Sequence, residues 1–235
     1  RAGRYGVSAS DDKTSRVWDL TNDKPLLTLR VPVGDDQEGK LNAVAISPDG
    51  NTVAVGGWTS AADASENIYF FDRASGRLSG RVSGLPNVVK HLAWSPDGRR
   101  LAAALGDSNG VRLYGAQPPY TELARDTAYE KDSYSISFDR NGRLVSTCED
   151  GKLRLYDANL RLLVPPRPVA GGSDPFFARF SPDGSRIAVG FNDSTTVAIV
   201  SGTDLTPRAT LDTREAGKGN LGIVTWSADG RRIYA

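Results

Sequence analysis

The sequence predicts an all-β fold built from repeated four-stranded units. The first observation is a recurring turn: Ser-Pro-Asp-Gly begins at Ser47, Ser95 and Ser181, Ser-Ala-Asp-Gly begins at Ser227, and a degenerate Asp-Arg-Asn-Gly begins at Asp139. The second is an out-of-phase series of aromatic-tipped runs, as in residues 16–19, 69–72 and 154–157. The third is that no stretch of helix length shows a 3.6-residue apolar period. A period of 42 to 48 residues with room for four strands indicates the blade of a β-propeller.

Each predicted blade reads as four strands, a to d, in order. An alternating run such as residues 43–46 is strand a. The Ser-Pro-Asp-Gly turn follows, because Pro fixes φ, Asp binds its own backbone and Gly tolerates a positive φ. A run of small and branched residues, such as 101–105, is strand b. A polar loop leads to the aromatic-tipped strand c, and a turn such as residues 73–76 leads to strand d at 77–82.

The strand count predicts four complete four-stranded blades plus two partial ones. The chain opens with strands b, c and d of one blade and ends with strands a and b of another. We expect residues 1–235 to form a single propeller domain that belongs to a seven-bladed ring. Because an open ring exposes strand edges, we expect sequence outside this chain to complete it. The start at Arg1 and the lack of methionine also predict a piece of a longer protein.

Aromatic and branched residues recur at the end of strand a, at Ile46, Trp94, Phe138, Phe180 and Trp226. An aromatic ligand box is one interpretation of this column. Packing between adjacent blades is favoured instead, because the residues recur at the repeat period.

These patterns resemble the WD-repeat family of β-propellers, most specifically at residues 9–19, "ASDDKTSRVWD". The resemblance implies a Gly-His pair before strand a, whose histidine links a buried polar network to the strand-c tryptophan. This chain has a single histidine, His91, which lies within strand a, and Leu85 stands near the expected place. We therefore expect that network to be absent or incomplete, and hydrophobic packing to hold the blades.

A second resemblance is to the propeller region of bacterial caspase-like proteins. It is carried by the strings "SDDKT", "AVGGW", "FDRASGR" and the segments leading into the first two Ser-Pro-Asp-Gly turns. The resemblance implies a cysteine-peptidase domain on the same polypeptide, and an exported or periplasmic setting. A cytoplasmic setting stays open. No part of this chain matches the peptidase domain, so no peptidase residue carries over.

Composition excludes several classes of function. The net charge is +1, which gives no reason to expect a nucleic-acid partner or an anionic membrane surface. No run approaches eighteen apolar residues, so no membrane insertion is expected. The single cysteine, Cys148, excludes an internal disulfide, and one cysteine with one histidine cannot build the usual zinc site.

Residues 34–40 match the spacing G-x-x-x-x-G-K of a phosphate-binding loop. Their interior holds Asp35, Asp36 and Glu38, which would repel a polyphosphate, and Leu41 stands where the metal-binding hydroxyl belongs. The pattern also predicts a strand after Lys40, where a phosphate loop needs a helix. We therefore expect neither a nucleotide nor any other cofactor.

No catalytic set or metal site is predicted. Cys148 ends a strand-b run and is expected to be a small core residue. The acidic pairs in b–c loops, such as Asp11–Asp12, lack the ladder that calcium needs and are expected to cap their turns.

The candidate binding surface is the top face, where the d–a and b–c connections lie. It carries acids, whereas the opposite turns carry arginines, although the separation is partial. Two top loops, 30–40 and 58–67, are longer than a blade needs, and long loops on a rigid scaffold carry specificity. Trp58 is an anchor if exposed and a core residue if it folds inward. The candidate partner-binding residues are Asp35, Asp36, Glu38, Trp58, Asp63, Glu66, Asp107, Glu149, Asp150 and Asp193.

The expected function is a non-catalytic scaffold that binds a protein or peptide, with the acids favouring a basic one. The second resemblance implies that this scaffold regulates, or recruits substrates for, a peptidase domain on the same polypeptide. The alternative is an enzyme with a site at the central channel. The strand-a starts there hold Asn42, Lys90, Ser133, Tyr134 and Phe176, which do not form a repeating set.

Overall fold

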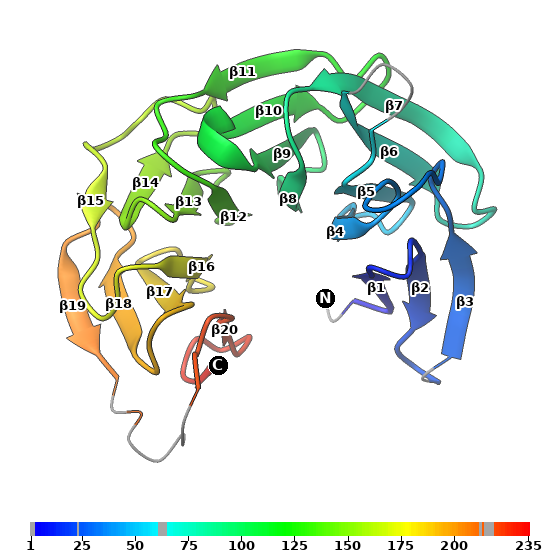
Figure 1. Cartoon of the computed structure of the whole chain (residues 1–235). Helices are drawn as coiled ribbons and strands as arrows, with labels where there is room; N and C mark the ends of the chain where they lie inside the picture. Colours follow the sequence, from blue (N-terminus) through cyan, green and yellow to red (C-terminus); the bar gives the residue numbers. More distant parts are fainter. Residues whose placement is uncertain (1–2, 23, 61–64, 212, 214–218) are drawn as a thin grey trace.

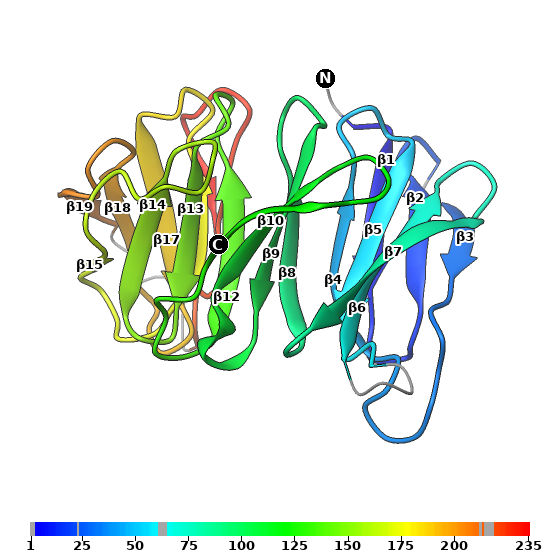
Figure 2. The same ribbon diagram turned by 90° about the horizontal axis from the view of Figure 1, so that it is seen from above.

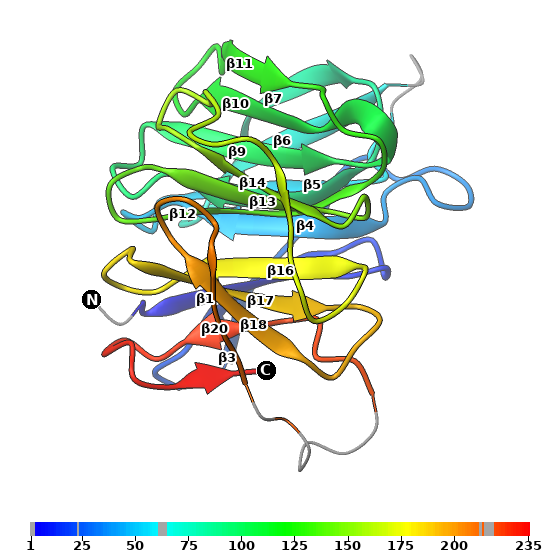
Figure 3. The ribbon, with the colours of Figure 1, turned by 90° about the vertical axis from the view of Figure 1, so that its left-hand side faces the viewer.

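The computed structural model describes residues 3–22, 24–60, 65–211, 213 and 219–235. Over these residues the strands form six antiparallel sheets, which stand side by side around a common axis (Figure 1). The arc is open between β1 and β20. Figures 2 and 3 show the arc from the side, with the connections gathered on two opposite faces.

The first half of the described chain forms three sheets, in which hydrogen-bonded neighbours follow the chain order. The first has three strands and the next two have four. A single 3-10 turn, η1 (Asp107–Asn109), connects two strands of the third sheet. The strands are β1 (Tyr5–Ala9), β2 (Ser15–Asp19), β3 (Lys24–Leu29); β4 (Leu41–Ile46), β5 (Thr52–Gly57), β6 (Glu66–Asp72), β7 (Leu78–Leu85); β8 (Val89–Trp94), β9 (Arg100–Leu105), β10 (Val111–Gly115) and β11 (Glu122–Asp126).

The second half forms two four-stranded sheets and a final pair of strands. The strands are β12 (Ser133–Phe138), β13 (Leu144–Cys148), β14 (Lys152–Tyr156), β15 (Arg167–Pro168); β16 (Pro175–Phe180), β17 (Arg186–Phe191), β18 (Val197–Ser201), β19 (Pro207–Thr210); β20 (Thr225–Trp226) and β21 (Ile233–Tyr234). The predicted all-β propeller with four complete blades and two partial ones is confirmed. The strands a to d of each complete sheet run from the inside to the outside of the arc (Figure 1).

The Ser-x-Asp-Gly turns share one hydrogen-bond pattern. In the turn after β4, Ser47 Oγ donates to Asp49 Oδ1 at 2.5 Å and accepts the Thr52 N–H at 2.9 Å. The turns at Ser95, Ser181 and Ser227 repeat both bonds. The glycine takes a left-handed φ of 68 to 75° in all four, which a β-carbon would oppose. The repeated sequence therefore specifies this turn locally.

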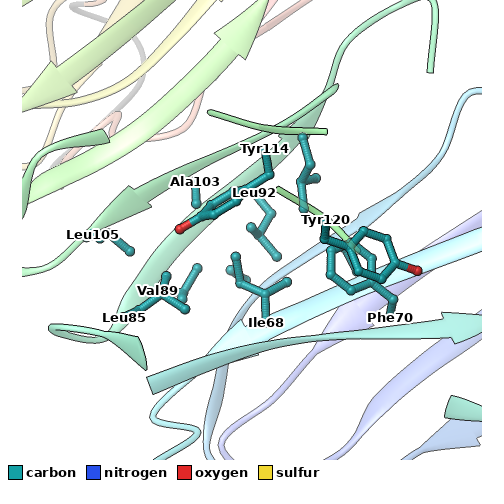
Figure 4. Packing of buried hydrophobic residues seen from close by; sticks show 12 residues of the cluster. Ile68, Phe70, Leu85, Val89, Leu92, Ala103, Leu105, Tyr114 and Tyr120 are labelled. Atoms are coloured by element: carbon teal, nitrogen blue, oxygen red, sulfur yellow. The ribbon is translucent and has the colours of Figure 1, made fainter. Parts of the chain in front are cut away.

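The core lies between neighbouring sheets. Figure 4 shows the cluster between the β4–β7 and β8–β11 sheets, where Ile68, Leu85 and Val89 pack beneath Tyr114. Phe70 stacks on Tyr120 with ring centroids 3.8 Å apart, and Trp94 meets Phe70 edge-on at 6.3 Å. The strand-a aromatic residue is thus part of the packing between blades.

Polar contacts also join the blades, which corrects the expectation that hydrophobic packing alone holds them. The strand-a indoles of Trp94 and Trp226 donate to the strand-a carbonyls of Ala45 and Arg179 in the preceding sheets, at 3.2 and 3.0 Å. Within the first sheet, Trp18 Nε1 donates to Ser8 Oγ at 3.0 Å.

A buried network in the β12–β15 sheet takes the place of the missing histidine. Tyr129 precedes β12, and its hydroxyl lies 2.5 Å from Ser146 Oγ and 2.8 Å from the Tyr156 hydroxyl. The Tyr156 hydroxyl donates to Asp126 Oδ2 at 2.8 Å. The Arg154 guanidinium lies 3.9 Å above the Tyr129 ring. A tyrosine therefore bridges the strand-b serine and the strand-c aromatic residue, so the expected loss of the network is wrong for this sheet.

Arginines of the face opposite the top face join the β8–β11, β12–β15 and β16–β19 sheets each to the next sheet along the chain. Arg143 donates to the carbonyls of Gly202 and Gly184 at 2.6 and 2.8 Å, and its Nε donates to Asp139 at 2.8 Å. Arg100 donates to the Ala158 carbonyl, and Arg186 donates to the Gly230 carbonyl at 3.1 Å. Several of the arginines that the sequence places on this face are therefore structural.

The described part of the chain contains no helix with the length and hydropathy that crossing a membrane requires.

Candidate functional site

The two long top loops form one structural unit at their bases. Gly39 N–H donates to the Trp58 carbonyl at 2.6 Å, and Trp58 N–H donates to the Lys40 carbonyl at 2.9 Å. From the first sheet, Lys13 Nζ donates to the Gly34 carbonyl at 2.8 Å. The 30–40 loop extends beyond the sheets between β3 and β4 (Figure 2). Trp58 is 37% exposed, so it lies at the surface of this unit as well as at its base.

The acids of the 30–40 loop differ in exposure. Asp35 and Asp36 are exposed, and Asp36 takes a left-handed φ of 49°. Glu38 is half-buried, and its carboxylate folds back over Gly34. Asp35 and Asp36 are thus the two acids that this loop presents to solvent.

Glu66 does not belong to an exposed acidic surface, which corrects its assignment from the sequence. The residue is 7% exposed, and its carboxylate accepts the Thr59 backbone N–H. Burial raises the pKa of this carboxyl. Thr59 Oγ1 also donates to the Asn67 carbonyl at 2.6 Å and accepts the Asn67 N–H at 3.0 Å, which closes the stem of the loop. Asp63 lies outside the described residues.

In the segment that matches a phosphate-binding loop, backbone N–H groups donate to carbonyl groups of the protein itself. Glu38 N–H donates to the Asp35 carbonyl at 3.1 Å, and Lys40 N–H donates to the Gln37 carbonyl at 2.9 Å. The predicted strand after Lys40 is confirmed, because β4 begins at Leu41. The N–H groups of Glu38, Gly39 and Lys40 are therefore already bonded, and a strand follows where a phosphate loop needs a helix N-terminus.

A second group of acids gathers where the inner strands β8, β12 and β16 begin. Asp107 N–H donates to Asp132, and Lys90 Nζ pairs with Asp132 at 2.8 Å. Lys131 Nζ pairs with Glu149 at 3.1 Å. We call Asp107, Asp132, Glu149, Asp174 and Asp193 the acidic cluster. Its five carboxylates meet two lysines, Lys90 and Lys131, so negative charge is in excess.

The electrostatics of this cluster are those of crowded carboxylates. Burial raises the pKa of Asp174, and the nearby Glu149 and Asp193 raise it further. Burial raises the pKa of Tyr134, and Asp174, Glu149 and Asp132 act in the same direction. Asp193 is exposed, but its carboxylate accepts the N–H groups of Ser173 and Asp174 at 2.8 and 3.2 Å, which lowers its pKa. The cluster therefore favours any cation that approaches it.

Asp150 is a structural residue, although the sequence places it among the binding candidates. Its side chain is 1% exposed and pairs with Arg154 at 2.6 Å. Burial alone would raise the pKa of Asp150, but the hydrogen bonds from Arg154 and from the Lys152 N–H lower it. Asp12 makes the equivalent bonds, to the Thr14 N–H at 2.9 Å and to Arg16 at 2.8 Å. The predicted capping of b–c turns thus holds at Asp12 and Asp150, whereas Asp193 bonds to the preceding d–a loop instead.

Of the residues named at the central channel, Lys90 pairs with Asp132 at 2.8 Å, and the others have separate environments. Asn42 is exposed, Ser133 is buried, and Tyr134 packs against Phe176 with ring centroids 5.0 Å apart. His91 Nδ1 accepts the Ile136 N–H at 3.3 Å, and its ring meets Phe177 edge-on at 5.0 Å. Burial lowers the pKa of His91 to about 3.

Cys148 has the environment of a core residue. It is fully buried, and its thiol donates to the Lys131 carbonyl at 3.5 Å. Burial raises its pKa to about 11, so the thiolate that a nucleophile requires is not formed near neutral pH.

Two segments of the chain, residues 77–114 and 124–157, match the family model described as WD domain, G-beta repeat. The chain carries WD40 repeats. The two matches cover β7 to β10 and β11 to β14, so each crosses from the outer strand of one sheet into the next sheet. The fold is that of a WD-repeat propeller, and WD40-repeat proteins are typically non-catalytic scaffolds.

Known proteins with WD repeats resemble parts of this chain. A probable cytosolic iron-sulfur protein assembly protein 1 of Cryptococcus neoformans is 32% identical over 35% of this chain, and small ribosomal subunit protein RACK1y of Oryza sativa is 33% identical over 43%. A periodic tryptophan protein 2 homolog of Dictyostelium discoideum is 24% identical over 65%. The matched regions span 22%, 27% and 15% of the lengths of these three relatives, respectively.

Sequence reasoning missed some residues of the acidic cluster. Asp132 is not among the candidates named from the sequence, although the charged run Glu130-Lys131-Asp132 before strand a is a signal for it. Asp174 is also absent from the binding candidates, although it directly precedes strand a of its blade. Only the structure shows that Asp107 and Asp132, which come from different sheets, meet across the interface between them.

Proposed function

We propose that this WD-repeat propeller is a non-catalytic interaction scaffold that binds a basic segment of a protein or peptide partner on its top face. The acidic cluster is the observation that carries the proposal, because five carboxylates with two lysines leave an excess of negative charge beside the inner strands. Trp58, which bonds through its backbone to the base of the loop that carries Asp35 and Asp36, supplies a second contact area, since aromatic residues are frequent anchors in protein interfaces. The names of two relatives, an assembly protein and a ribosomal subunit protein, are consistent with a role in assemblies.

Charge-neutralising variants test this proposal. The double variant Asp107→Asn/Glu149→Gln removes two negative charges without adding bulk. We expect it to weaken the binding of a tetra-arginine peptide about three- to tenfold at low salt, measured by isothermal titration calorimetry. Gln117→Lys is the control, because it adds positive charge at an exposed position on the opposite face. Equal affinities in the parent chain and the double variant would refute the proposal.

The finer proposal is that the scaffold recruits substrates for, or regulates, a caspase-like peptidase domain on the same polypeptide. It rests on the short strings quoted above, "SDDKT", "AVGGW" and "FDRASGR". Sequencing the gene on both sides of the segment for residues 1–235 tests it. A peptidase domain in the same reading frame is the expected result, and its absence would rule out this version of the function.

We also propose that residues 1–235 are one propeller domain whose ring, of seven blades, is completed by further sequence of the same protein. The support is the opening between β1 and β20 and the unequal terminal sheets of three and two strands. A structure of the longer protein that showed a separate fold after Ala235 and no added blade would contradict this.

A further inference from the structure

A cavity of about 280 Å³ lies between the outer strands of two neighbouring sheets. One wall is the end of β7, at Val82 to Gly84, and the other is formed by Arg112, Tyr114 and Glu122 of β10 and β11. Tyr120 closes one side by stacking on Phe70, as Figure 4 shows. Open space surrounds Gly84, where an added β-carbon would meet nothing within 4 Å.

Arg112 is the buried charge of this cavity. Its side chain is 9% exposed, and Nη1 donates to Glu122 Oε2 at 2.9 Å. Its Nε is buried and makes no hydrogen bond in the described structure. A buried guanidinium donor without a partner costs free energy, so an anion that accepts from it would be bound favourably.

Positive charge exceeds negative charge around the cavity. Arg125 is the cross-strand neighbour of Arg112, and its Nε pairs with the other oxygen of Glu122 at 2.5 Å. Arg81 also lines the cavity. The guanidinium groups of Arg112 and Arg125 therefore share one carboxylate, that of Glu122, and Arg81 adds a further positive charge to the lining. A phosphate monoester, which carries nearly two negative charges at neutral pH, matches this excess better than a carboxylate does.

Two tyrosines, Tyr114 and Tyr120, complete the lining. Burial raises the pKa of Tyr114 to about 12, so its hydroxyl stays neutral and able to donate. Gly80 lies directly beneath the Tyr120 ring, where an added β-carbon would lie 2.5 Å from Cε2. This close approach holds the ring at the edge of the cavity.

We propose that the cavity between β7 and β10–β11 binds a phosphorylated side chain of a protein partner, with Arg112 as the buried anchor and Arg125 as the outer contact. This site differs in position and in charge from the acidic cluster, so it does not depend on the function proposed above.

The test uses the full 235-residue chain and three versions of one short peptide, carrying phosphoserine, glutamate or serine at a single position. We expect the chain to bind the phosphoserine peptide at least tenfold more tightly than the other two, as measured by isothermal titration calorimetry. The affinity for the phosphoserine peptide should fall as the salt concentration rises. Arg112→Gln should weaken that binding about tenfold or more, and the exposed Arg125→Gln about threefold. Arg167→Gln, an exposed arginine on the outer strand β15, is the matched control and should change nothing.

Glu122→Gln keeps the test informative if Arg112→Gln does not fold. It removes the carboxylate that competes for both guanidinium groups, and we expect it to tighten phosphoserine binding about three- to tenfold. Equal affinities for the phosphoserine and serine peptides would overturn the proposal. So would unchanged binding in both Arg125→Gln and Glu122→Gln. Equal affinities for phosphoserine and glutamate would overturn the assignment to phosphate.

Discussion

The Tyr129 hydroxyl lies between two other hydroxyls, those of Ser146 and Tyr156, in the interior of the β12–β15 sheet. These hydroxyls are buried away from solvent, so each depends on the others for hydrogen bonds. Burial raises the pKa of Tyr129, which keeps the hydroxyl protonated and able to donate. A single side chain from the connection before β12 thereby fixes strands b and c of the same sheet.

Tyr129→Phe should lower the free energy of unfolding by about 1–3 kcal/mol, because it leaves Ser146 and Tyr156 short of a buried partner. Urea denaturation measures the change. Tyr120→Phe, which removes a hydroxyl at the edge of an open cavity, should cost much less. A Tyr129→Phe/Ser146→Ala double variant should lose less than the sum of the two single variants, and strict additivity would argue against the network.

The single histidine, His91, predicts how the free energy of unfolding depends on pH. Burial holds the pKa of His91 at about 3 in the folded chain, whereas an exposed histidine titrates at about 6.5. Below pH 6.5 the unfolded chain therefore binds a proton that the folded chain excludes. The free energy of unfolding should fall as pH drops from about 7 to about 5, by no more than about 1.4 kcal/mol per pH unit.

His91→Gln should flatten this pH dependence, measured by urea denaturation at both pH values. Glu66, whose pKa burial raises, acts in the opposite direction but is the same in both proteins, so it cancels in the comparison. Parallel pH profiles for the parent chain and the variant would show that His91 titrates normally.

At the scale of single elements, arginines link sheets through backbone carbonyls. Arg143 contacts Asp139 in its own turn and Gly184 and Gly202 in the next sheet, and the Asp139 side chain is completely buried. Its guanidinium therefore neutralises a buried charge and binds two turns of a neighbouring sheet at once.

Arg143→Met should destabilise the chain by about 2–4 kcal/mol, because it leaves the Asp139 carboxylate buried without its cation. The midpoint of urea denaturation measures this. Arg140→Met, an exposed neighbour in the same turn, should have little effect. Similar losses in the two variants would mean that the interblade bonds of Arg143 contribute nothing specific.

At the scale of the whole molecule, the arc should be least stable at its two ends. Every residue of β1 is half-buried, and β20 and β21 pair over only two residues each, whereas β13 is buried throughout. Hydrogen–deuterium exchange should be fastest in the amides of β1, β20 and β21 and slowest in β9 and β13. Equal protection in β21 and β13 would contradict this picture.

Much of this architecture is readable from the sequence, because the signals that specify it are local and repeated. Ser47 and Asp49 form their turn with residues no more than five positions away, so the motif predicts the geometry. Contacts between sheets are different. The burial of Glu66 depends on how the stem of its loop closes, and the Asp107–Asp132 contact joins residues 25 positions apart. No local pattern encodes such distances, so the candidate site was only partly predictable.

The direction of the arginine contacts has a consequence for how the chain folds during synthesis. Arg100, Arg143 and Arg186 each donate to a carbonyl further along the chain, 58, 59 and 44 residues later. These three sheets therefore lack these bonds, as the chain leaves the ribosome, until part of the following sheet has been made. In this part of the chain each new sheet completes the one before it, so the last sheet of a growing chain presents an unfinished surface to a chaperone or a protease.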